Sequence, residues 1–302
     1  MKLLITGAWR YTERQRDEID RLGHDVIFMQ NESDALPCSY EDVEGVICNG
    51  LFLHHPIERF VNLRYIQLTS AGFDRVPMDY AISHGIEVNN ARGVYSVPMA
   101  EFALSSVLSV YKQAEHFRAA QAEHRWDKHR GLRELFGKRV CIVGCGSVGG
   151  ECAIRFSAMG CEVTGIDAVP KLQNGFSSVL PVRFLSDEIS SSDIIVLTLP
   201  LTRGTRGIIN RAMLESLTDG AVIVNISRGA VIDTAALIEV LAAREDITAI
   251  LDVFEEEPLD GDSPLWDMSN VTVTPHNSFV GEGNAERLWS VIINNLRKNE
   301  AK

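Results

Sequence analysis

A glycine motif, Gly144-Cys-Gly-Ser-Val-Gly149, follows the apolar run Val140–Val143 and opens a helix-like run, Glu151–Met159. In this context the first glycine allows a tight turn, the second lets the backbone approach a pyrophosphate, and the third lets helix pack on strand. The unpaired N–H groups of the helix start would face the phosphates. The motif therefore predicts a dinucleotide site rather than an ordinary turn. The residues expected to contact the dinucleotide are Gly144, Gly146, Ser147, Val148 and Gly149.

The next apolar run, Glu162–Asp167, ends on an acid. A carboxylate there can accept hydrogen bonds from the adenosine ribose diol and would repel a 2′-phosphate. Asp167 therefore favours NAD over NADP. Lys171 follows closely enough to leave this preference open.

Polar side chains suited to acid–base chemistry follow three later apolar runs. They are Arg228, Asp252 and His276, and an acidic segment, Glu255–Glu257, lies between the last two. Because ligands bind beyond the carboxyl ends of the strands in open α/β sheets, we expect these groups to share one rim.

Reduction of a 2-oxo acid needs few groups. The planar fork of an Arg can hold the carboxylate and polarise the ketone, which suits Arg228. A His can deliver the proton to the ketone oxygen, which suits His276. A carboxylate beside that His would fix its orientation and favour its charged form. Spacing alone does not choose among Glu255, Glu256 and Glu257.

The elements that must position these groups alternate along the whole chain. Short β-rich runs separated by helix-like segments predict parallel sheets in α/β units. The strands expected in the first part of the chain are Leu3–Gly7, Asp25–Met29, Gly45–Asn49, Tyr65–Thr69 and Ile86–Asn89, with helices at Tyr11–Leu22 and Pro77–His84.

A stretch without Gly or further Pro predicts one long helix, Pro98–Ala122, that separates two domains. Six strands with helical connections then indicate a doubly wound Rossmann sheet. A last helix is expected at Gly283–Leu296. The six expected strands are Arg139–Val143, Glu162–Ile166, Asp193–Leu199, Ala221–Ile226, Ile247–Val253 and Val271–Thr274.

Composition excludes several classes of protein. A chain of 302 residues that is 45% hydrophobic can form two globular domains. A net charge of −12 argues against a nucleic-acid partner, although a local Arg can still hold an anionic substrate. No apolar run approaches the roughly 18 residues of a membrane span, and the first residues do not resemble a signal peptide.

The cysteines and histidines give no sign of a metal site. The six cysteines form no C-x-x-C pair and most lie in apolar runs, which predicts reduced thiols in a cytoplasmic protein rather than disulfides or zinc. The histidines show neither H-x-x-x-H nor H-E-x-x-H spacing, so no metal is expected. His54 and His55 could line a substrate mouth or form a surface pair at a helix start, and we favour the surface pair.

The order of these motifs resembles the D-isomer-specific 2-hydroxyacid dehydrogenase family over most of the chain, most strongly from about Gly137 to His276. The resemblance implies a Rossmann nucleotide domain inserted in a flavodoxin-like substrate domain, each with a doubly wound parallel sheet. The matching pieces are Gly137-Lys138, Gly144-Cys-Gly-Ser-Val-Gly149, Leu199-Pro-Leu-Thr202 followed by Thr205, Asn225-Ile-Ser-Arg-Gly229, Asp252-Val-Phe-Glu-Glu-Glu-Pro258 and Thr274-Pro-His276.

The resemblance also implies roles for single residues. The catalytic Arg of the family falls on Arg228 and its acid/base His on His276. Its Glu, the residue before the proline, falls on Glu257, a choice that spacing alone could not make. Asp252 resembles the aspartate that contacts the nicotinamide carboxamide. Further cofactor contacts are expected at Pro200 and Thr205.

In the first domain, Ser70-Ala-Gly-Phe-Asp74 resembles the loop whose N–H groups hold the substrate carboxylate. Ala71 and Gly72 would then bind the substrate together with Arg228. The resemblance implies a homodimer with the long helix in the interface. It implies a substrate domain of residues 1–95 plus 284–302 and an NAD-binding domain of residues 96–283.

The leading hypothesis is NADH-dependent reduction of a small 2-oxo acid such as glyoxylate, hydroxypyruvate or pyruvate. An acid phosphorylated at a distal carbon, as in 3-phosphoglycerate dehydrogenases, is the alternative substrate. The segment Cys48–Phe52 lacks the Arg that phosphoglycerate-type members carry there. Phe102 and Thr198 stand where the family often has His. Neither is one of the three catalytic positions, so we expect these departures to concern the substrate and the fine geometry of the site more than the activity. An NAD-sensing protein without catalysis is the alternative from another class, and the complete Arg–Glu–His set argues against it.

Overall fold

A computed structural model describes residues 1–300, without the side chain of Glu300. The chain divides into two compact units. The first consists of Met1–Tyr95 together with the segment that begins at Gly281, and the second is Ser96–Val280. The domain boundary expected from the sequence is residue 284. The last two residues of the returning segment, Ala301 and Lys302, lie outside the described residues.

The first unit contains a five-stranded parallel sheet in the order β2-β1-β3-β4-β5. This order is the flavodoxin-like one, in which the chain reverses its direction of travel across the sheet between β1 and β3. The strands are β1 (Lys2–Thr6), β2 (Asp25–Met29), β3 (Gly45–Cys48), β4 (Tyr65–Leu68) and β5 (Glu87–Asn89).

Helices α1 (Glu13–Arg21), α2 (Met78–Ser83) and α9 (Asn284–Glu300) belong to the same unit. A capping box between Thr12 and Gln15 starts α1, because each side chain accepts a hydrogen bond from the other residue's backbone. Helix α9 returns from the far end of the sequence and packs an apolar stripe on the sheet. The stripe consists of Leu288, Ile292 and Leu296, and it meets Leu3, Ile5 and Tyr65.

The second unit contains a seven-stranded parallel sheet in the order β12-β11-β10-β9-β6-β7-β8. This is the Rossmann order with one strand added at an edge, and its switch point lies between β6 and β9. The strands are β6 (Arg139–Val143), β7 (Glu162–Asp167), β8 (Ser178–Pro181), β9 (Ile194–Leu197), β10 (Val222–Asn225), β11 (Thr248–Leu251) and β12 (Val271–Val273).

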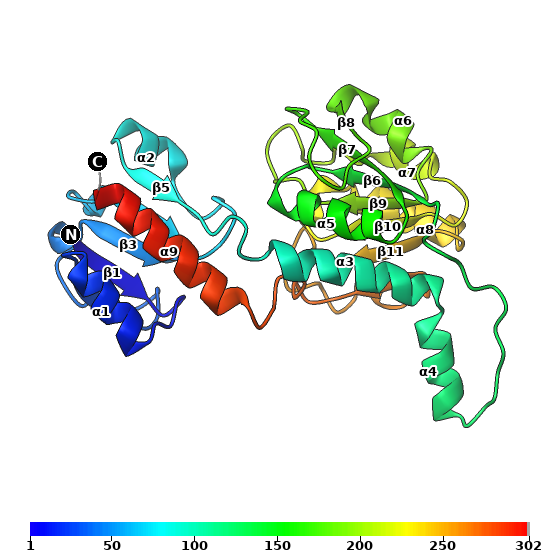
Figure 1. Cartoon of the computed structure of the whole chain (residues 1–302), viewed down its shortest axis with the longest axis horizontal. Coiled ribbons are helices and arrows are strands. Elements are labelled where there is room, and N and C mark those ends of the chain that lie inside the picture. Colours follow the sequence, from blue (N-terminus) through cyan, green and yellow to red (C-terminus); the bar gives the residue numbers. More distant parts are fainter. Residues whose placement is uncertain (301–302) are drawn as a thin grey trace. The chain divides into compact units, whose positions relative to one another are not determined.

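Apolar clusters cover both faces of this sheet. On one face, small side chains such as Ala103 on α3 and Ala153 on α5 let these two helices lie side by side (Figure 1). The helices are α3 (Ser96–Tyr111), α4 (Ala114–Ala122), α5 (Ser147–Ala158), α6 (Leu185–Ile189), α7 (Arg211–Glu215) and α8 (Thr234–Ala243).

Short 3₁₀ helices connect the longer elements in both units. They are η1 (Tyr40–Asp42), η2 (Leu51–Leu53), η3 (Ile57–Arg59), η4 (Val182–Phe184), η5 (Gly229–Val231) and η6 (Pro264–Trp266). Two of them, η2 and η5, come shortly after the carboxyl ends of β3 and β10.

The predicted class, two parallel-sheet α/β domains with a Rossmann-type second one, is confirmed. The single long helix is wrong: α3 ends at Tyr111 and α4 begins at Ala114, because Gln113 adopts a left-handed backbone with φ 52°. The six-strand sheet is also wrong, since β8 adds a seventh strand beside β7. Its half-buried residues form an edge strand with no strong apolar pattern.

Candidate functional site

The glycine motif forms a tight connection between β6 and α5. Gly144 has φ +98°, and a Cβ there would lie 2.8 Å from the backbone of Leu199, two residues after the end of β9. A Cβ on Gly149 would lie 2.1 Å from the carbonyl oxygen of Gly144. Both positions therefore require glycine, the first for a left-handed turn and the second for close packing of helix on strand.

The middle glycine differs, because a Cβ on Gly146 would meet nothing within 4 Å. This position borders open space, and α5 begins at the next residue, Ser147. The N–H groups of Ser147, Val148 and Gly149 lie in the first turn, where they have no acceptor four residues earlier in the helix. The open flank and the helix N-terminus fit the pyrophosphate of a dinucleotide.

Asp167 ends β7 beside this motif, and its carboxylate is held on both oxygens. Oδ2 accepts the N–H of Cys145 at 2.8 Å, and Oδ1 accepts the N–H of Val169 at 2.9 Å. The half-buried side chain is thereby fixed next to the glycine loop. Lys171 is exposed. These positions fit a dinucleotide whose ribose hydroxyls meet the acid.

Burial keeps the thiol inside the glycine loop protonated. Burial first, and then the negative charge of Asp167, raise the pKa of Cys145 to about 12. This cysteine is therefore a packing residue and not a nucleophile.

Two side chains that were not predicted to belong to the site also hold the loop. Thr198 donates its hydroxyl to the carbonyl oxygen of Gly144 at 2.6 Å, and Gln173 donates its amide to that of Cys145 at 2.7 Å. Thr198 directly follows β9 at the switch point, and this position was the one signal in the sequence. No local motif marks Gln173.

Arg228 follows β10 and is half-buried. Asn225, the last residue of that strand, donates its side-chain amide to the carbonyl oxygen of Arg228 at 3.0 Å. The next residue, Gly229, packs so closely on another loop that a Cβ would lie 1.9 Å from the carbonyl carbon of Phe254. This contact joins the Arg228 segment to the loop that carries Glu257.

Glu257 and His276 come from different loops and meet directly. Oε2 of Glu257 lies 2.7 Å from Nδ1 of His276, and Oε1 accepts the N–H of Phe254 at 3.1 Å. Because a carboxylate only accepts, the hydrogen belongs on Nδ1, and Nε2 is left for a ligand. The two side chains are 36% and 40% exposed, so a small molecule can reach them.

Asp252 organises the segment that contains His276. Its carboxylate is fully buried and accepts hydrogen bonds from Thr274 Oγ1 at 2.6 Å and from the N–H groups of Asn277 at 2.8 Å and Ser278 at 2.9 Å. The His276 N–H donates to the Asp252 carbonyl oxygen at 2.8 Å, and His276 has φ 50°. This network holds His276 in a backbone conformation that non-glycine residues rarely adopt.

Pro200 and Thr205 close a turn after β9. Thr205 donates its hydroxyl to the carbonyl oxygen of Pro200 at 2.6 Å, and the same oxygen of Thr205 accepts the N–H of Thr202 at 2.7 Å. The turn lies at the carboxyl end of the sheet, next to the strand that carries the glycine motif.

The remaining predicted residues belong to the first unit. Ala71 and Gly72 follow β4, and their carbonyl oxygens accept hydrogen bonds from Asn90 at 2.6 Å and Ser70 at 3.2 Å. These bonds fix the orientation of both peptide groups. Among the two histidines, His54 is exposed.

The expected surface pair is wrong for His55. Its side chain is 6% exposed, and its Nδ1 lies 2.7 Å from the Tyr40 hydroxyl. This residue is therefore part of the packing.

Within residues 1–300, no group of three or more His, Cys, Asp or Glu side chains is arranged to hold a metal ion. No helix in this range is long and apolar enough to cross a bilayer.

A Rossmann sheet with a glycine loop, and with an Arg and a paired His and Glu beyond its carboxyl edge, defines a dinucleotide-dependent dehydrogenase. Residues 104–278 match the family model described as "D-isomer specific 2-hydroxyacid dehydrogenase, NAD binding domain". The chain belongs to this family of NAD(P)-dependent 2-hydroxyacid dehydrogenases.

Known proteins support this assignment. The chain is 35% identical over 237 residues to hydroxypyruvate reductase of Thermotoga maritima, covering 76% of this chain and 74% of that one. It is 32% identical over 223 residues to D-3-phosphoglycerate dehydrogenase of Archaeoglobus fulgidus, where the match covers 73% of this chain but 42% of the longer relative. A D-isomer specific 2-hydroxyacid dehydrogenase from Xanthobacter autotrophicus Py2, solved with NADPH and MES, has a TM-score of 0.80 and 31% identity and covers 99% of this chain and 95% of its own.

Proposed function

We propose that this protein reduces a small 2-oxo acid of the glyoxylate, hydroxypyruvate or pyruvate type to the 2-hydroxy acid, with NADH as the reductant. The observation that carries the proposal is the 2.7 Å contact between Glu257 Oε2 and His276 Nδ1. Because Glu257 binds Nδ1, the Nε2 atom of His276 is available to transfer a proton to a ligand.

Each catalytic side chain has a distinct task in this proposal. Arg228 binds the carboxylate and the ketone oxygen with its guanidinium group. His276, charged and paired with Glu257, donates the Nε2 proton to the ketone oxygen. Glu257 stabilises the imidazolium and fixes its orientation. Asp252 keeps the His276 segment in place through its three hydrogen bonds, in addition to the contact with the nicotinamide carboxamide that the resemblance implies.

The bound dinucleotide supplies the hydride that adds to the ketone carbon. The glycine loop and the N-terminus of α5 would hold its pyrophosphate, and the Pro200–Thr205 turn would add contacts to the dinucleotide. NAD rather than NADP is proposed because both oxygens of Asp167 are anchored by backbone amides. An anchored acid cannot turn away from a 2′-phosphate.

The first unit is proposed as the substrate domain. Its Ala71 and Gly72 amides would add hydrogen bonds to the substrate carboxylate. The carbonyl oxygens of Ser70 and Ala71 support this role, because they accept hydrogen bonds from the Ala91 N–H at 2.8 Å and the Asn90 side chain at 2.6 Å. Each carbonyl shares a planar peptide group with the N–H of the next residue, so the N–H groups of Ala71 and Gly72 have fixed directions. The cytoplasmic location stays a prediction from the cysteine pattern.

Oxidation of NADH, followed over glyoxylate, hydroxypyruvate and pyruvate and repeated with NADPH, tests the proposal. Wild-type protein is expected to reduce at least one of these acids. The variant His276→Ala should lose about 10²–10⁴-fold in kcat/KM while still binding NADH. Near-full turnover by the variant would rule out His276 as the proton donor.

Two alternatives are tested by the same assay when a phosphorylated 2-oxo acid is added to the panel. Preference for a phosphorylated acid would place the protein with phosphoglycerate-type dehydrogenases. Tight NADH binding without turnover of any 2-oxo acid would indicate an NAD-sensing protein.

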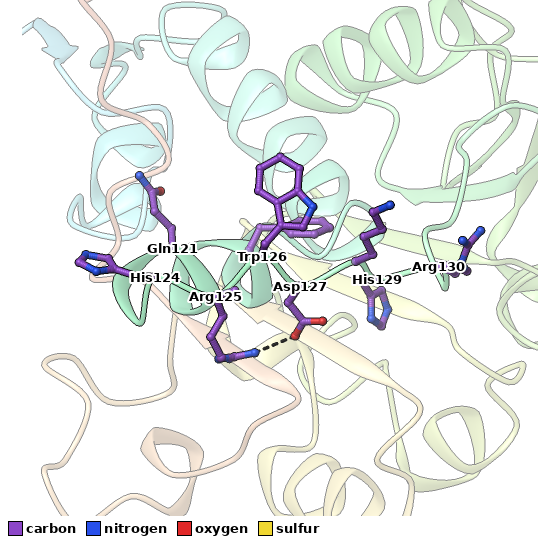
Figure 2. A pocket seen from close by; sticks show the side chains of 10 residues that line it. Gln121, His124, Arg125, Trp126, Asp127, His129 and Arg130 are labelled. Atoms are coloured by element: carbon purple, nitrogen blue, oxygen red, sulfur yellow. Dashed lines mark hydrogen bonds and ion pairs between the residues drawn. The ribbon is translucent and has the colours of Figure 1, made fainter.

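A homodimer is proposed on the basis of the exposed segment that follows α4. Trp126 is 93% exposed and Phe136 is 80% exposed, and large apolar side chains rarely face water without a partner. Figure 2 shows Trp126 pointing away from the Arg125–Asp127 ion pair, on a hollow lined by residues of α4 and the following segment. Light scattering should give the mass of two chains, and Trp126→Ser should shift the population toward monomer. A monomeric wild type would contradict this proposal.

A further inference from the structure

Glu32, in the segment after β2, spans the ends of two neighbouring strands of the first unit. Its Oε1 accepts the Thr6 hydroxyl and the Asn49 N–H, both at 2.7 Å. Its Oε2 accepts the Gly50 N–H at 2.6 Å. Thr6 ends β1, and Asn49 and Gly50 directly follow β3. The carboxylate therefore binds two consecutive backbone amides from a distant part of the chain.

The Glu32 carboxylate lies at the switch point of the first sheet. Strands β1 and β3 are neighbours, and the strand order reverses between them. Open α/β sheets bind ligands at such a switch point, beyond the carboxyl ends of the strands. Consecutive N–H groups in a turn form a site for anions. At this switch point the carboxylate of Glu32 binds the two N–H groups, in the position that an anionic ligand would otherwise take.

Little room is left for a second anion. A Cβ at Gly50 would lie 3.3 Å from Glu32 Oε2, so the carboxylate is packed directly on the loop backbone.

The charge of Glu32 also acts on the neighbouring strand: burial first, and then Glu32, raise the pKa of the Cys48 thiol. Arg75 approaches the same loop, with its Cδ 3.7 Å from the Cβ position of Gly50. The described residues show no ion pair between Arg75 and Glu32, so the negative charge is not neutralised by direct contact.

The loop after β3 borders the segment proposed to bind the substrate carboxylate. Strand β4 is the neighbour of β3, and the N–H of Thr69 donates to the carbonyl oxygen of Cys48 at 2.9 Å. Ala71 and Gly72 follow after Ser70. A substrate held by these amides has the Glu32-bound loop as its neighbour along the sheet edge.

We propose that Glu32 is a specificity-determining residue: it occupies the anion-binding amides of Asn49 and Gly50 and restricts the substrate to 2-oxo acids without a second, distal anionic group. This inference rests on the proposed function, whose substrate class it narrows. The physical cause is twofold. The amides that could bind a phosphate are already satisfied, and a fixed negative charge stands where the phosphate would lie.

The test compares hydroxypyruvate with its 3-phosphate ester. In wild-type protein kcat/KM should favour hydroxypyruvate, and Glu32→Gln should shift the ratio toward the phosphate ester by about tenfold or more. Glu44→Gln is the matched control, because Glu44 also accepts a backbone N–H, that of Lys2, but at the opposite end of β1. An unchanged ratio in folded Glu32→Gln protein would overturn the inference.

Two measurements separate this inference from the proposed function. If wild-type protein reduces none of glyoxylate, hydroxypyruvate and pyruvate, the proposed function fails. Thermal stabilisation by 3-phosphoglycerate relative to glycerate then tests Glu32 without turnover, and it should increase only in Glu32→Gln.

If Glu32→Gln does not fold, inhibition of the wild-type enzyme tests the role of Glu32 instead. Glycerate should inhibit more strongly than 3-phosphoglycerate at low salt, with a smaller difference at high salt. Stronger inhibition by the phosphorylated acid would overturn the inference.

Discussion

The two oxygens of Glu257 bind different partners: Oε2 lies 2.7 Å from His276 Nδ1, and Oε1 accepts the backbone N–H of Phe254 at 3.1 Å. The backbone contact orients the carboxylate, and the carboxylate in turn orients the imidazole. The pair is thus fixed by an acid whose own position does not depend on a ligand.

Replacing Glu257 by Gln should reduce kcat/KM for the preferred 2-oxo acid by roughly a hundredfold or more, because the imidazolium loses its counter-charge. Glu256→Gln is the control, since Glu256 lies exposed in the same loop. It should keep near wild-type activity. Equal losses in both variants would show that general loop charge, and not the contact with His276, supports catalysis.

Gly229→Ala should destabilise the second unit strongly, because the new Cβ would lie 1.9 Å from the carbonyl carbon of Phe254. The clash would push the Arg228 segment away from the loop that carries Glu257, at a cost of about 1–3 kcal/mol or more. Gly261→Ala is the matched control, since a Cβ there meets nothing within 4 Å. Thermal unfolding measures both variants, and equal melting temperatures would contradict the close contact.

Two glycines of the dinucleotide loop should respond differently to Ala. Gly149→Ala should lower the melting temperature, because its Cβ would lie 2.1 Å from the carbonyl oxygen of Gly144. Gly146→Ala should fold normally but bind NADH about tenfold more weakly, because its side chain would stand where the pyrophosphate approaches. Fluorescence titration with NADH and thermal unfolding separate the two effects. Unchanged NADH affinity in Gly146→Ala would remove the pyrophosphate from this position.

Asp167→Asn should lower the ratio of kcat/KM for NADH to that for NADPH by about tenfold, because the charge that repels a 2′-phosphate is removed. The asparagine oxygen can still accept one of the two backbone hydrogen bonds, from Cys145 or Val169. Asp187→Asn, an exposed position on α6, controls for net charge. A wild type that prefers NADPH would refute the assignment of Asp167.

Asp193 connects the first strand of the second sheet to the start of β9. Lys138 Nζ lies 2.8 Å from its Oδ1, and the Arg139 N–H donates to Oδ2 at 2.9 Å. Burial acts to raise the pKa of the Asp193 carboxyl, but the hydrogen bonds and charges of Lys138 and Arg139 lower it more, so the pKa lies below its usual value.

A carboxyl with a lowered folded-state pKa adds stability above its ordinary pKa, and this stability is lost as the pH falls through the folded-state value. Asp193→Asn should therefore lower the melting temperature at pH 7. The difference from wild type should shrink below about pH 4. Asp267→Asn, an exposed position, should show no such trend. A difference that stays constant with pH would mean that packing, and not charge, explains the effect.

Local signals in the sequence determined the dinucleotide loop and most of the sheet. The glycine spacing predicts the turn because Gly144 needs its positive φ for the turn itself and Gly149 meets the carbonyl oxygen of Gly144 in the same loop. The strand bounds agree with the structure to within two residues, since buried parallel strands are short apolar runs. The sequence shows an Arg, a His and three Glu residues as candidates for the catalytic set. Spacing does not distinguish Glu257 from its two neighbours, so the choice of Glu257 rests on the family resemblance.

The tertiary structure decided what depends on contacts between distant residues. No Gly or Pro in the sequence marks the left-handed turn at Gln113. Strand β8 has no strong apolar pattern, and only its pairing with β7 identifies it as a strand. Glu32 binds Asn49 and Gly50, and the backbone of Phe254 excludes any side chain at Gly229. Local spacing cannot encode such pairs, because the free energy of each contact depends on which chain segments the fold brings together.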